Sequence, residues 1–380
     1  MCLADRLAKP GRTIFGPKAQ AARLEADKAY CKQLIRSAAI PTAEARIFEH
    51  PDSAISFAQT HETPLVVKAS GLAKGKGVVV CDNGDDAVEA VNLIMKEQAF
   101  GEAGNTVVIE ERLVGQEVSV LALVDGRNIF VLDPAQDHKQ AFEGDRGPNT
   151  GGMGAYCPTP LVDDQLMQTI EREILVPTVD ALRRDGVEYK GVLYAGLMLT
   201  AGGPKVLEYN CRFGDPEAQP LMMRCQGDLL ELMLATAHQA SGNHRVAVEH
   251  FDRLIRDHPR TRQAHASRIP LARCHIALGQ LNKALAELTH VVENNDVVTP
   301  DSREYLDAII ELGRLHYRME QYEPAISRLQ EVRRWVRSQI PREEQHKLLD
   351  TKCQLRSEDI RRYLERVFPD AKKRKQREFE

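Results

Sequence analysis

The stretch VVKASGLAKGKGVVV, from Val66 to Val80, places a loop rich in glycine and lysine between two runs of β-branched residues. A phosphate-binding P-loop needs Ser or Thr directly after its lysine and then opens a helix. Here Lys76 is followed by Gly77 and the strand pattern GVVV, so the stretch predicts two strands joined by a loop. The glycines let backbone N–H groups approach an anion closely, and the lysines add positive charge. The stretch is compatible with phosphate binding and, equally, with a mobile surface hairpin.

The composition indicates ordinary hydrophobic cores. The chain has 380 residues, 43% of them hydrophobic, so two or three domains are expected. It contains no apolar run of about 18 residues, the length that a membrane helix needs. Its first residues, MCLADRLAKPGRT, lack the apolar segment of a signal peptide. The eight cysteines form no C-x-x-C pair, which favours reduced thiols in the cytoplasm over disulfides or a zinc site.

Charge and glycine are unevenly distributed along the chain. Residues 241–380 contain 27 Lys and Arg against 22 Asp and Glu, whereas the whole chain contains 51 against 55. Of the 25 glycines, only Gly242, Gly279 and Gly313 lie beyond residue 240. These contrasts indicate that two differently built parts are joined near residue 240.

The first part predicts a mixed α+β domain with antiparallel strand pairs. Strand patterns occur at residues 64–68, 77–80, 105–113, 117–125, 191–200 and 204–210, and helices are expected at residues 21–38, 85–98 and 164–184. The sequence contains no G-x-G-x-x-G, G-x-S-x-G or H-E-x-x-H motif, so dinucleotide-binding, hydrolase and zinc-protease functions lack support.

The stretch KVLEYNCRFGDPEAQ combines a strand with a dense set of polar side chains. Alternate residues of a strand share a face, so Glu208 and Asn210 are expected to point the same way. A carboxylate and an amide oxygen side by side suit a hard cation such as Mg²⁺ or Mn²⁺. Arg212 follows on the same side if the strand persists, where its guanidinium can bind a transferring phosphoryl group. The alternative is an exposed polar strand face.

Two glycine-rich or charged stretches in the middle of the chain are further candidates. GPNTGGMGAY, residues 147–156, predicts a loop whose backbone can wrap a small ligand, or a plain connection. AQDHKQAFEGDRG groups Asp137, His138 and Lys139, which form either a binding cluster or a solvated charge cluster.

Together these stretches resemble the phosphoribosylamine–glycine ligase family of the ATP-grasp superfamily. The resemblance runs from about Ile14 to about Ala237, in the family's order and spacing, and it is specific. It is carried by IFGPKAQAARLEADKAYCK, VVKASGLAKGKGVVV, VIEERLVGQEVSV, AQDHKQAFEGDRGPNTGGMGAY, GVLYAGLM and KVLEYNCRFGDPEAQP.

The resemblance implies a reaction of purine biosynthesis. ATP, glycine and 5-phosphoribosylamine give glycinamide ribonucleotide, ADP and phosphate through glycyl phosphate. The implied cofactors are ATP and Mg²⁺ or Mn²⁺. Such phosphoryl transfer depends mainly on positioning and charge stabilisation.

The resemblance also assigns roles to individual residues. The β-loop-β element looks like the flap that closes over the triphosphate, and EERL resembles the hinge that reads adenine. The implied ATP-binding residues are Lys28, Lys68, Ser70, Gly71, Lys74, Gly75, Lys76, Gly77, Glu110, Glu111, Leu113 and Glu117. The implied metal ligands are Glu208 and Asn210. Catalytic contacts are expected from Arg212, Asp215, Asn149, Gly151 and Gly152, and contacts to the substrates from Asp137, Lys139, Thr150 and Asp215.

The sequence departs from the family pattern in four ways. The family's amino-terminal βαβ domain and its carboxy-terminal domain have no counterpart in the sequence, so ligation is expected to be impaired. Gln140 stands where the family usually has Arg, and Ser70 stands where the flap usually reads ADG. The expected domains are a remnant helix at 1–17, an ATP-grasp domain at 18–238 with its flap subdomain at about 42–112, helical repeats at 239–340, and a helical extension with a basic tail at 341–380.

The last 140 residues contain a repeat of small and large apolar residues four positions apart. The pairs are Ala247 with Phe251, Ala284 with Leu288, and Ala325 with Leu329. Their spacing predicts all-α repeats similar to the tetratricopeptide pattern, which offer a groove for a peptide or protein partner. An ordinary antiparallel helical bundle is the alternative. The segment GDLLELMLATAHQASG fits both the ligase family and the first helix of the first repeat, so one helix is expected to serve both domains.

Two functions therefore stand side by side. The first is an ATP- and metal-dependent ligase of small molecules. The second is a nucleotide-binding ATP-grasp module with weak turnover, joined to a protein-binding repeat scaffold. Neither requires a membrane or a nucleic acid, and the basic tail KKRKQREFE is expected to be a solvated end.

Overall fold

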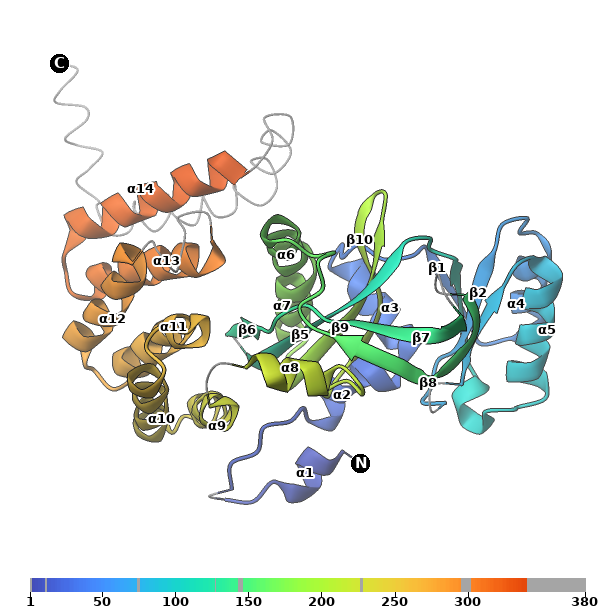
Figure 1. Ribbon diagram of the computed structural model, residues 1–380, viewed down its shortest axis with the longest axis horizontal. Coiled ribbons are helices and arrows are strands. Elements are labelled where there is room, and N and C mark those ends of the chain that lie inside the picture. The colour runs from blue at the N-terminus through green and yellow to red at the C-terminus, as the bar shows by residue number, and fades with distance from the viewer. Residues whose placement is uncertain are drawn as a thin grey trace, which may run out of the picture. The chain divides into compact units, whose positions relative to one another are not determined.

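The computed structural model describes residues 2–10, 12–73, 76–126, 128–142, 146–225, 228–294 and 302–339 (Figure 1). Residues up to Glu287 belong to one compact unit, and a second unit begins at Leu288. The helices are α1 (Leu3–Leu7), α2 (Ala19–Ala26), α3 (Lys28–Ser37), α4 (Pro51–Gln59), α5 (Gly84–Val91), α6 (Asp164–Ile170), α7 (Val176–Arg184), α8 (Ala218–Arg224), α9 (Leu229–Ala240), α10 (His244–Asp257), α11 (Arg262–Ala277), α12 (Leu281–Glu293), α13 (Arg303–Arg318) and α14 (Tyr322–Gln339). None of these helices is long and apolar enough to cross a membrane.

The described strands form two four-stranded antiparallel sheets and a two-stranded ribbon. The smaller sheet has the order β1-β4-β2-β3 and the central sheet the order β10-β9-β5-β6, while β7 pairs with β8. The strands are β1 (Ala45–Phe48), β2 (Leu65–Ala69), β3 (Val78–Cys81), β4 (Val107–Glu111), β5 (Gln116–Asp125), β6 (Ile129–Val131), β7 (Gln136–Phe142), β8 (Arg146–Tyr156), β9 (Lys190–Thr200) and β10 (Gly203–Asn210). The predicted α+β core with antiparallel pairs is confirmed.

The smaller sheet carries the glycine- and lysine-rich stretch. β2 and β3 are the two predicted strands, and they pair with Lys68 opposite Val78. Helices α4 and α5 cover one face of this sheet (Figure 1). The alanines of these helices and the valines of the strands form one buried core, which fixes the strands that present the loop.

The predicted helix at residues 21–38 is in fact two helices, because the chain breaks at Asp27. Asp27 has extended backbone angles, and its carboxylate accepts a hydrogen bond from the backbone N–H of Tyr30 at 3.0 Å. An aspartate at this position satisfies one of the free N–H groups of the first turn, so it starts a new helix. The break makes Lys28 the first residue of α3.

The prediction of a loop at residues 147–156 is wrong. These residues belong to β8, which pairs antiparallel with β7 so that Gln136 lies opposite Tyr156. Glycine adopts extended backbone angles as readily as turn angles, so a glycine-rich stretch can complete a strand when a partner strand supplies hydrogen bonds. β7 is that partner, and the charged cluster around Asp137 lies on it.

The central sheet is buried on both faces. Val118, Val120 and Val124 of β5 point into a core that includes residues of α3, α6 and α7. Leu121 and Leu123 point to the other face, into a core that includes residues of α8 to α11. The alternation follows from the period of two residues along a strand, and it explains why β5 is almost continuously hydrophobic.

The helix at residues 229–240 joins the central sheet to the first helical repeat. In α9, Leu232 and Ala235 are buried in the same core as Leu121 of β5 and Phe251 of α10. A polar chain adds to this joint: Asn128 donates to Gln239 of α9 at 3.1 Å, and Gln239 donates to the Pro270 carbonyl at 2.9 Å. We infer that α9 serves both the sheet and the repeat, as the sequence predicts.

Three turns of the helical region share one backbone feature. Gly242 and Gly279 have positive φ angles of 77° and 74°, and Glu320 has 60°. Each lies five residues before the small residue of a repeat, Ala247, Ala284 or Ala325, all of which are buried. The same left-handed turn therefore precedes the second helix of each pair, although Glu320 adopts it with a side chain that disfavours it.

Two leucines of α9 test its place in the core. Leu232→Ala is expected to lower the free energy of unfolding of the first unit by about 2–5 kcal/mol, because Leu232 is 2% exposed and its loss leaves a cavity. Leu230→Ala is the matched control, since Leu230 is 63% exposed, and its effect is expected within about 0.5 kcal/mol. Chemical denaturation of the full chain measures both, and equal effects would contradict the shared core.

Candidate active site

A buried cluster of charges lies where the smaller sheet meets β10. Glu110 of β4 is 2% exposed and forms ion pairs with Lys68 of β2 and with Lys32 of α3, the latter at 2.6 Å. Lys32 also donates to Thr42 Oγ1 at 2.7 Å, and Lys68 to the Leu207 carbonyl at 3.3 Å. Two buried lysines thus share one buried carboxylate, which leaves an excess of positive charge away from water.

Lys28 extends this cluster toward the loop between β2 and β3. Its Nζ donates to the carbonyls of Ala69 at 3.0 Å and Gly71 at 3.3 Å. Burial lowers the pKa of Lys28, the nearby Glu208 carboxylate raises it, and the positive charge of Lys68 lowers it further. The side chains of Lys28, Lys68 and Glu208, from α3, β2 and β10, are therefore close enough to interact electrostatically. Burial also lowers the pKa of Lys32, although Glu110 opposes the shift. Buried cations of this kind favour an anionic ligand.

Further contacts hold the smaller sheet against β10. Thr42 Oγ1 donates to the Val206 carbonyl at 2.6 Å, and Lys205 Nζ forms an ion pair with Glu111 at 3.1 Å. Burial opposes ionisation of Glu111, but hydrogen bonds from the Glu44 N–H and from Lys205 outweigh it and lower its pKa. These contacts set the distance between the lysine cluster and the strand that carries Glu208.

Glu208 and Asn210 lie on the same face of β10, as strand alternation predicts, and an irregularity before Glu208 decides which face that is. The register shifts between Val206 and Glu208, so Glu208 pairs with Gly196 and Asn210 with Tyr194. Val206 and Tyr209 remain in the core on the opposite face. The bulge therefore turns Glu208 away from the core that holds Val206.

The residues at the end of β10 fit a hard divalent cation. The Glu208 carboxylate is exposed and has no hydrogen bond or ion pair with any described residue. Asn210 Oδ1 accepts from Arg212 Nη2 at 3.3 Å, and Arg212 Nε pairs with Glu25 at 3.1 Å. In the described part of the chain, no three His, Cys, Asp or Glu side chains gather around one point, so the donor set is this carboxylate with the amide oxygen.

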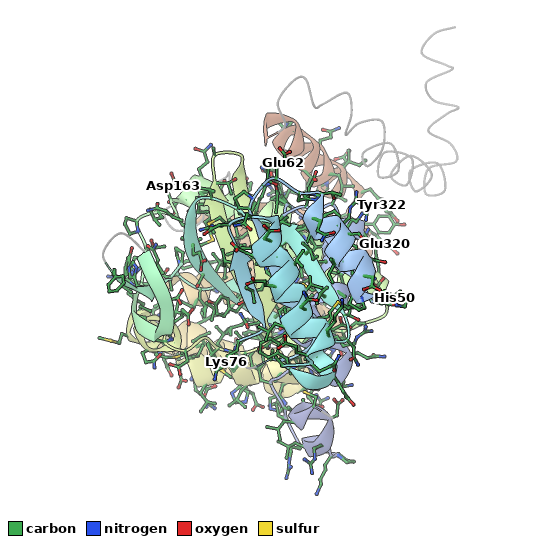
Figure 2. The ribbon with its side chains drawn as sticks, turned by 90° about the vertical axis from the view of Figure 1, so that its right-hand side faces the viewer. His50, Glu62, Lys76, Asp163, Glu320 and Tyr322 are labelled. Carbon is green, nitrogen blue, oxygen red and sulfur yellow. The ribbon has the colours of Figure 1, made fainter. Side chains whose placement is uncertain are left out.

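The loop after β2 is anchored to the start of α3. Ser70 Oγ accepts from the Ala29 N–H at 2.9 Å and donates to Asp27 at 3.0 Å, and its carbonyl accepts from the Lys28 N–H. A Cβ at Gly71 would lie 2.7 Å from the Ala103 backbone, and one at Gly77 would lie 2.6 Å from Ala73 Cβ. Both glycines are therefore needed for close packing. Lys76 is exposed and is labelled in Figure 2, whereas Lys74 and Gly75 lie outside the described residues.

The remaining predicted residues lie on elements around this site. Leu113 is half-buried between β4 and β5, and Glu117 is exposed near the start of β5. Asp137 of β7 is half-buried, and Asp215 accepts from Gln219 at 3.3 Å. On the ribbon lie Lys139, Asn149, Thr150, Gly151 and Gly152, whose side chains or immediate surroundings are outside the described part.

Several residues of the site were not predicted. Lys32 lies one helical turn after Lys28 on α3, a spacing that places both on one helix face, so this signal was present in the sequence. Glu25 and Lys205 reach the site only through strand pairing and helix packing over long sequence separations. No local pattern marks them.

Two sheets that enclose buried lysines beside a carboxylate–amide pair define an ATP-grasp domain. The chain belongs to the family described as phosphoribosylglycinamide synthetase, ATP-grasp (A) domain, whose profile matches residues 26–218. The profile of the tetratricopeptide repeat matches residues 230–261, which cover α10 and all but the first residue of α9.

Curated relatives support this placement. The chain is 54% identical over 239 residues to a phosphoribosylamine–glycine ligase of Rhodopirellula baltica, covering 61% of this chain and 55% of the relative. It is 50% identical over 235 residues to the human trifunctional purine biosynthetic protein adenosine-3, covering 62% of this chain and 23% of the relative. The chain thus spans about half, or less, of the length of these relatives.

Solved structures agree with the fold. A phosphoribosylamine–glycine ligase of Thermotoga maritima superposes with a TM-score of 0.55 at 36% identity, covering 60% of this chain and 57% of that one. A biotin carboxylase of Campylobacter jejuni superposes with a TM-score of 0.50 at 19% identity, covering 62% of this chain and 50% of that one. The second likeness concerns the fold alone.

Adjacent glutamates of β4 test the buried cluster. Glu110→Gln leaves Lys32 and Lys68 buried without a counter-charge, so the free energy of unfolding is expected to fall by about 3–5 kcal/mol. Glu111→Gln removes the partner of one partly exposed lysine, and its cost is expected at about 0–1 kcal/mol. Urea denaturation at neutral pH measures both variants. If Glu110→Gln were as mild as Glu111→Gln, the stability of the fold would not depend on the ion pairs of Glu110.

Proposed function

We propose that this protein ligates glycine to 5-phosphoribosylamine with consumption of ATP, giving glycinamide ribonucleotide, ADP and phosphate. The observation that carries the proposal is the cluster of Lys28, Lys32 and Lys68 beside β10, where the Glu208 carboxylate interacts electrostatically with Lys28 and shares a strand face with Asn210. Buried lysines suit a polyphosphate, and the oxygen pair suits its cation. The names of the half-length relatives supply the substrates.

In the proposed first step, a glycine carboxylate oxygen attacks the γ-phosphorus of ATP. A new phosphorus–oxygen bond forms as the bond to the β-phosphate oxygen breaks, which releases ADP and leaves glycyl phosphate. Lys28 and Lys68 hold the phosphates, and the Arg212 guanidinium lies beside Asn210 to offset charge on the transferred group. Bound Mg²⁺, or Mn²⁺, held by Glu208 and Asn210 would neutralise phosphate charge.

In the proposed second step, the amine of phosphoribosylamine attacks the carbonyl carbon of glycyl phosphate. The carbon–nitrogen bond forms as the bond from the carbonyl carbon to the bridging oxygen breaks; phosphate leaves with that oxygen and the bonding electron pair, and the amine loses one proton to solvent. Asp137, Lys139, Thr150 and Asp215, with the backbone of Asn149, Gly151 and Gly152, are the proposed contacts to the substrates. The ribbon β7–β8 would bring most of them to the site, because it pairs Gln140 with Asn149.

The adenine and ribose contacts are proposed from the position of the β4–β5 connection. Glu111 and Leu113 lie there, and Glu117 follows at the start of β5. Ser70, Gly71, Lys74, Gly75, Lys76 and Gly77 form the proposed flap over the phosphates. Ser70 and Gly71 are tied to α3 and to Ala103, so closure would have to occur beyond them.

A second function is favoured by the repeat match and by the core that α9 shares with the sheet. In this alternative the ATP-grasp unit binds nucleotide with weak turnover, and the helical repeats bind a protein partner. A cytoplasmic location is proposed for either function, and the free state of the described cysteines is compatible with it.

An ADP-release assay decides between the two functions. With Mg·ATP present, the ligase is expected to release ADP only when glycine is added, and to form glycinamide ribonucleotide when phosphoribosylamine is generated in the same tube. Glu208→Ala is expected to lower the rate by at least about tenfold, since a lost charged contact is worth roughly 1.5–3 kcal/mol. Glu62→Ala is the control, because Glu62 is an exposed carboxylate on the face shown in Figure 2.

The possible results of this assay distinguish the ligase from the binding module. ADP release that ignores glycine would contradict the ligase proposal. A thermal shift with Mg·ATP but no glycine-dependent release would favour the binding module. If Glu62→Ala lowered the rate of ADP release as much as Glu208→Ala does, the Glu208 carboxylate would have no specific role in the reaction.

A further inference from the structure

A buried group of hydroxyls and one carboxylate lies next to the proposed site and has no part in the steps above. Tyr194 of β9 donates its hydroxyl to Glu217 Oε1 at 2.5 Å. Ser119 of β5 lies 2.8 Å from the same hydroxyl and donates to Glu217 Oε1 at 3.4 Å. All three side chains are at least nine-tenths buried.

The strand register places this group beside the candidate metal pair. Tyr194 is directly opposite Asn210, while Gly196 lies between Glu208 on one side and Ser119 on the other. Directly opposite residues share a face of a sheet. Ser119 and Tyr194 therefore lie on the same face of the sheet as Glu208 and Asn210. Ser119 is in the row of Glu208 across the strands, and Tyr194 is in the row of Asn210.

Glu217 connects this face to the loop that carries Arg212 and Asp215. It lies at the amino end of α8, directly after that loop. A Cβ on Gly214 would lie 2.2 Å from Glu217 Oε2 and 3.0 Å from the Tyr194 ring. The loop backbone is therefore folded directly over the carboxylate, and glycine is required for this close approach.

The carboxyl group of Glu217 distinguishes this cluster from ordinary core packing. Within the described residues its carboxylate has no cationic partner, and its only donors are the two hydroxyls. A carboxylate buried with neutral donors alone costs stability compared with an apolar side chain of similar size. Burial, and then Glu217, raise the pKa of Tyr194, so Tyr194 keeps its proton and remains a donor.

We propose that Glu217, held by Tyr194 and Ser119, is a positioning residue that fixes the loop of Arg212 and Asp215 on the face of the candidate metal pair. The inference rests on the proposed function, because its consequence for catalysis is the placement of Arg212 at the transferred phosphoryl group. Arg212 is otherwise held by Glu25, Asn210 and the Phe213 carbonyl. These partners fix the guanidinium, whereas Glu217 fixes the backbone that follows it.

The test uses the full chain with Tyr194→Phe and Glu217→Gln, which preserve size and remove the hydroxyl donor or the charge. The matched controls are Tyr305→Phe and Glu331→Gln, because Tyr305 donates to Glu331 at 2.6 Å in the second unit. We expect kcat for glycine-dependent ADP release to fall about 10- to 100-fold in the first pair, with KM for ATP changed less than about threefold, as for a lost charged hydrogen bond. The controls should leave both constants unchanged.

Two further readouts separate positioning from stability. The double variant Tyr194→Phe/Glu217→Gln should be no slower than Glu217→Gln alone, since both act through one contact. Amide hydrogen exchange of residues 211–218 in the presence of Mg·ATP should accelerate in Glu217→Gln and not in Glu331→Gln. A lower melting temperature with unchanged kcat and unchanged exchange in this loop would overturn the proposal.

The exchange measurement also keeps this inference distinct from the proposed function. If the parent protein releases no ADP in response to glycine, the ligase proposal fails, whereas exchange of residues 211–218 still tests the positioning role. Faster exchange in Glu217→Gln would then support positioning of the loop alone. Equal exchange in Glu217→Gln and Glu331→Gln would overturn it.

Discussion

The ion pairs of Glu110 with Lys32 and Lys68 join the helix α3 and the strands β2 and β4 at a point removed from water. Breaking a buried pair leaves an uncompensated charge, so this carboxylate fixes where both lysines lie. Lys68 also reaches the Leu207 carbonyl, which ties the smaller sheet to β10. The loop after β2, the lysine cluster and the strand of Glu208 therefore keep one mutual arrangement. The excess positive charge that remains is the physical reason for proposing a polyphosphate ligand.

One face of the central sheet is divided between the candidate site and packing against helices. At one end Ser119, Gly196 and Glu208 line the candidate site. At the other end Leu121 and Leu123 pack with the helices of the first repeat. Tyr194 lies at the border, because its ring is in that shared core and its hydroxyl binds Glu217. Phe213 of the loop after Arg212 packs against the same core, so α9 and this loop are neighbours of one hydrophobic cluster.

The sequence predicts the strands and most helices because their patterns are local. Strand alternation suffices to predict that Glu208 and Asn210 share one face. The bulge that turns this face away from the core of Val206 depends on the register with β9, which the sequence does not show. The sequence predicts a loop where the glycine-rich β8 lies, because composition does not reveal a partner strand. The break at Asp27 is a capping signal inside a helical pattern. Ser119, Tyr194 and Glu217 come from three separate elements, so only the fold brings them together.

The central claim is that the buried lysines bind the phosphate groups of ATP, and proton uptake on binding of Mg·ATP tests it most directly. Burial lowers the pKa of Lys28 in the free protein, and neighbouring phosphates would raise it again. Calorimetry in buffers of different ionisation enthalpy should therefore show proton uptake at alkaline pH, below the ordinary pKa of lysine, and this uptake should decrease as the pH is lowered. Lys28→Met should remove most of this uptake, and Lys96→Met, at an exposed lysine, should not. Binding without proton uptake at any alkaline pH, or uptake unaffected by Lys28→Met, would contradict the account.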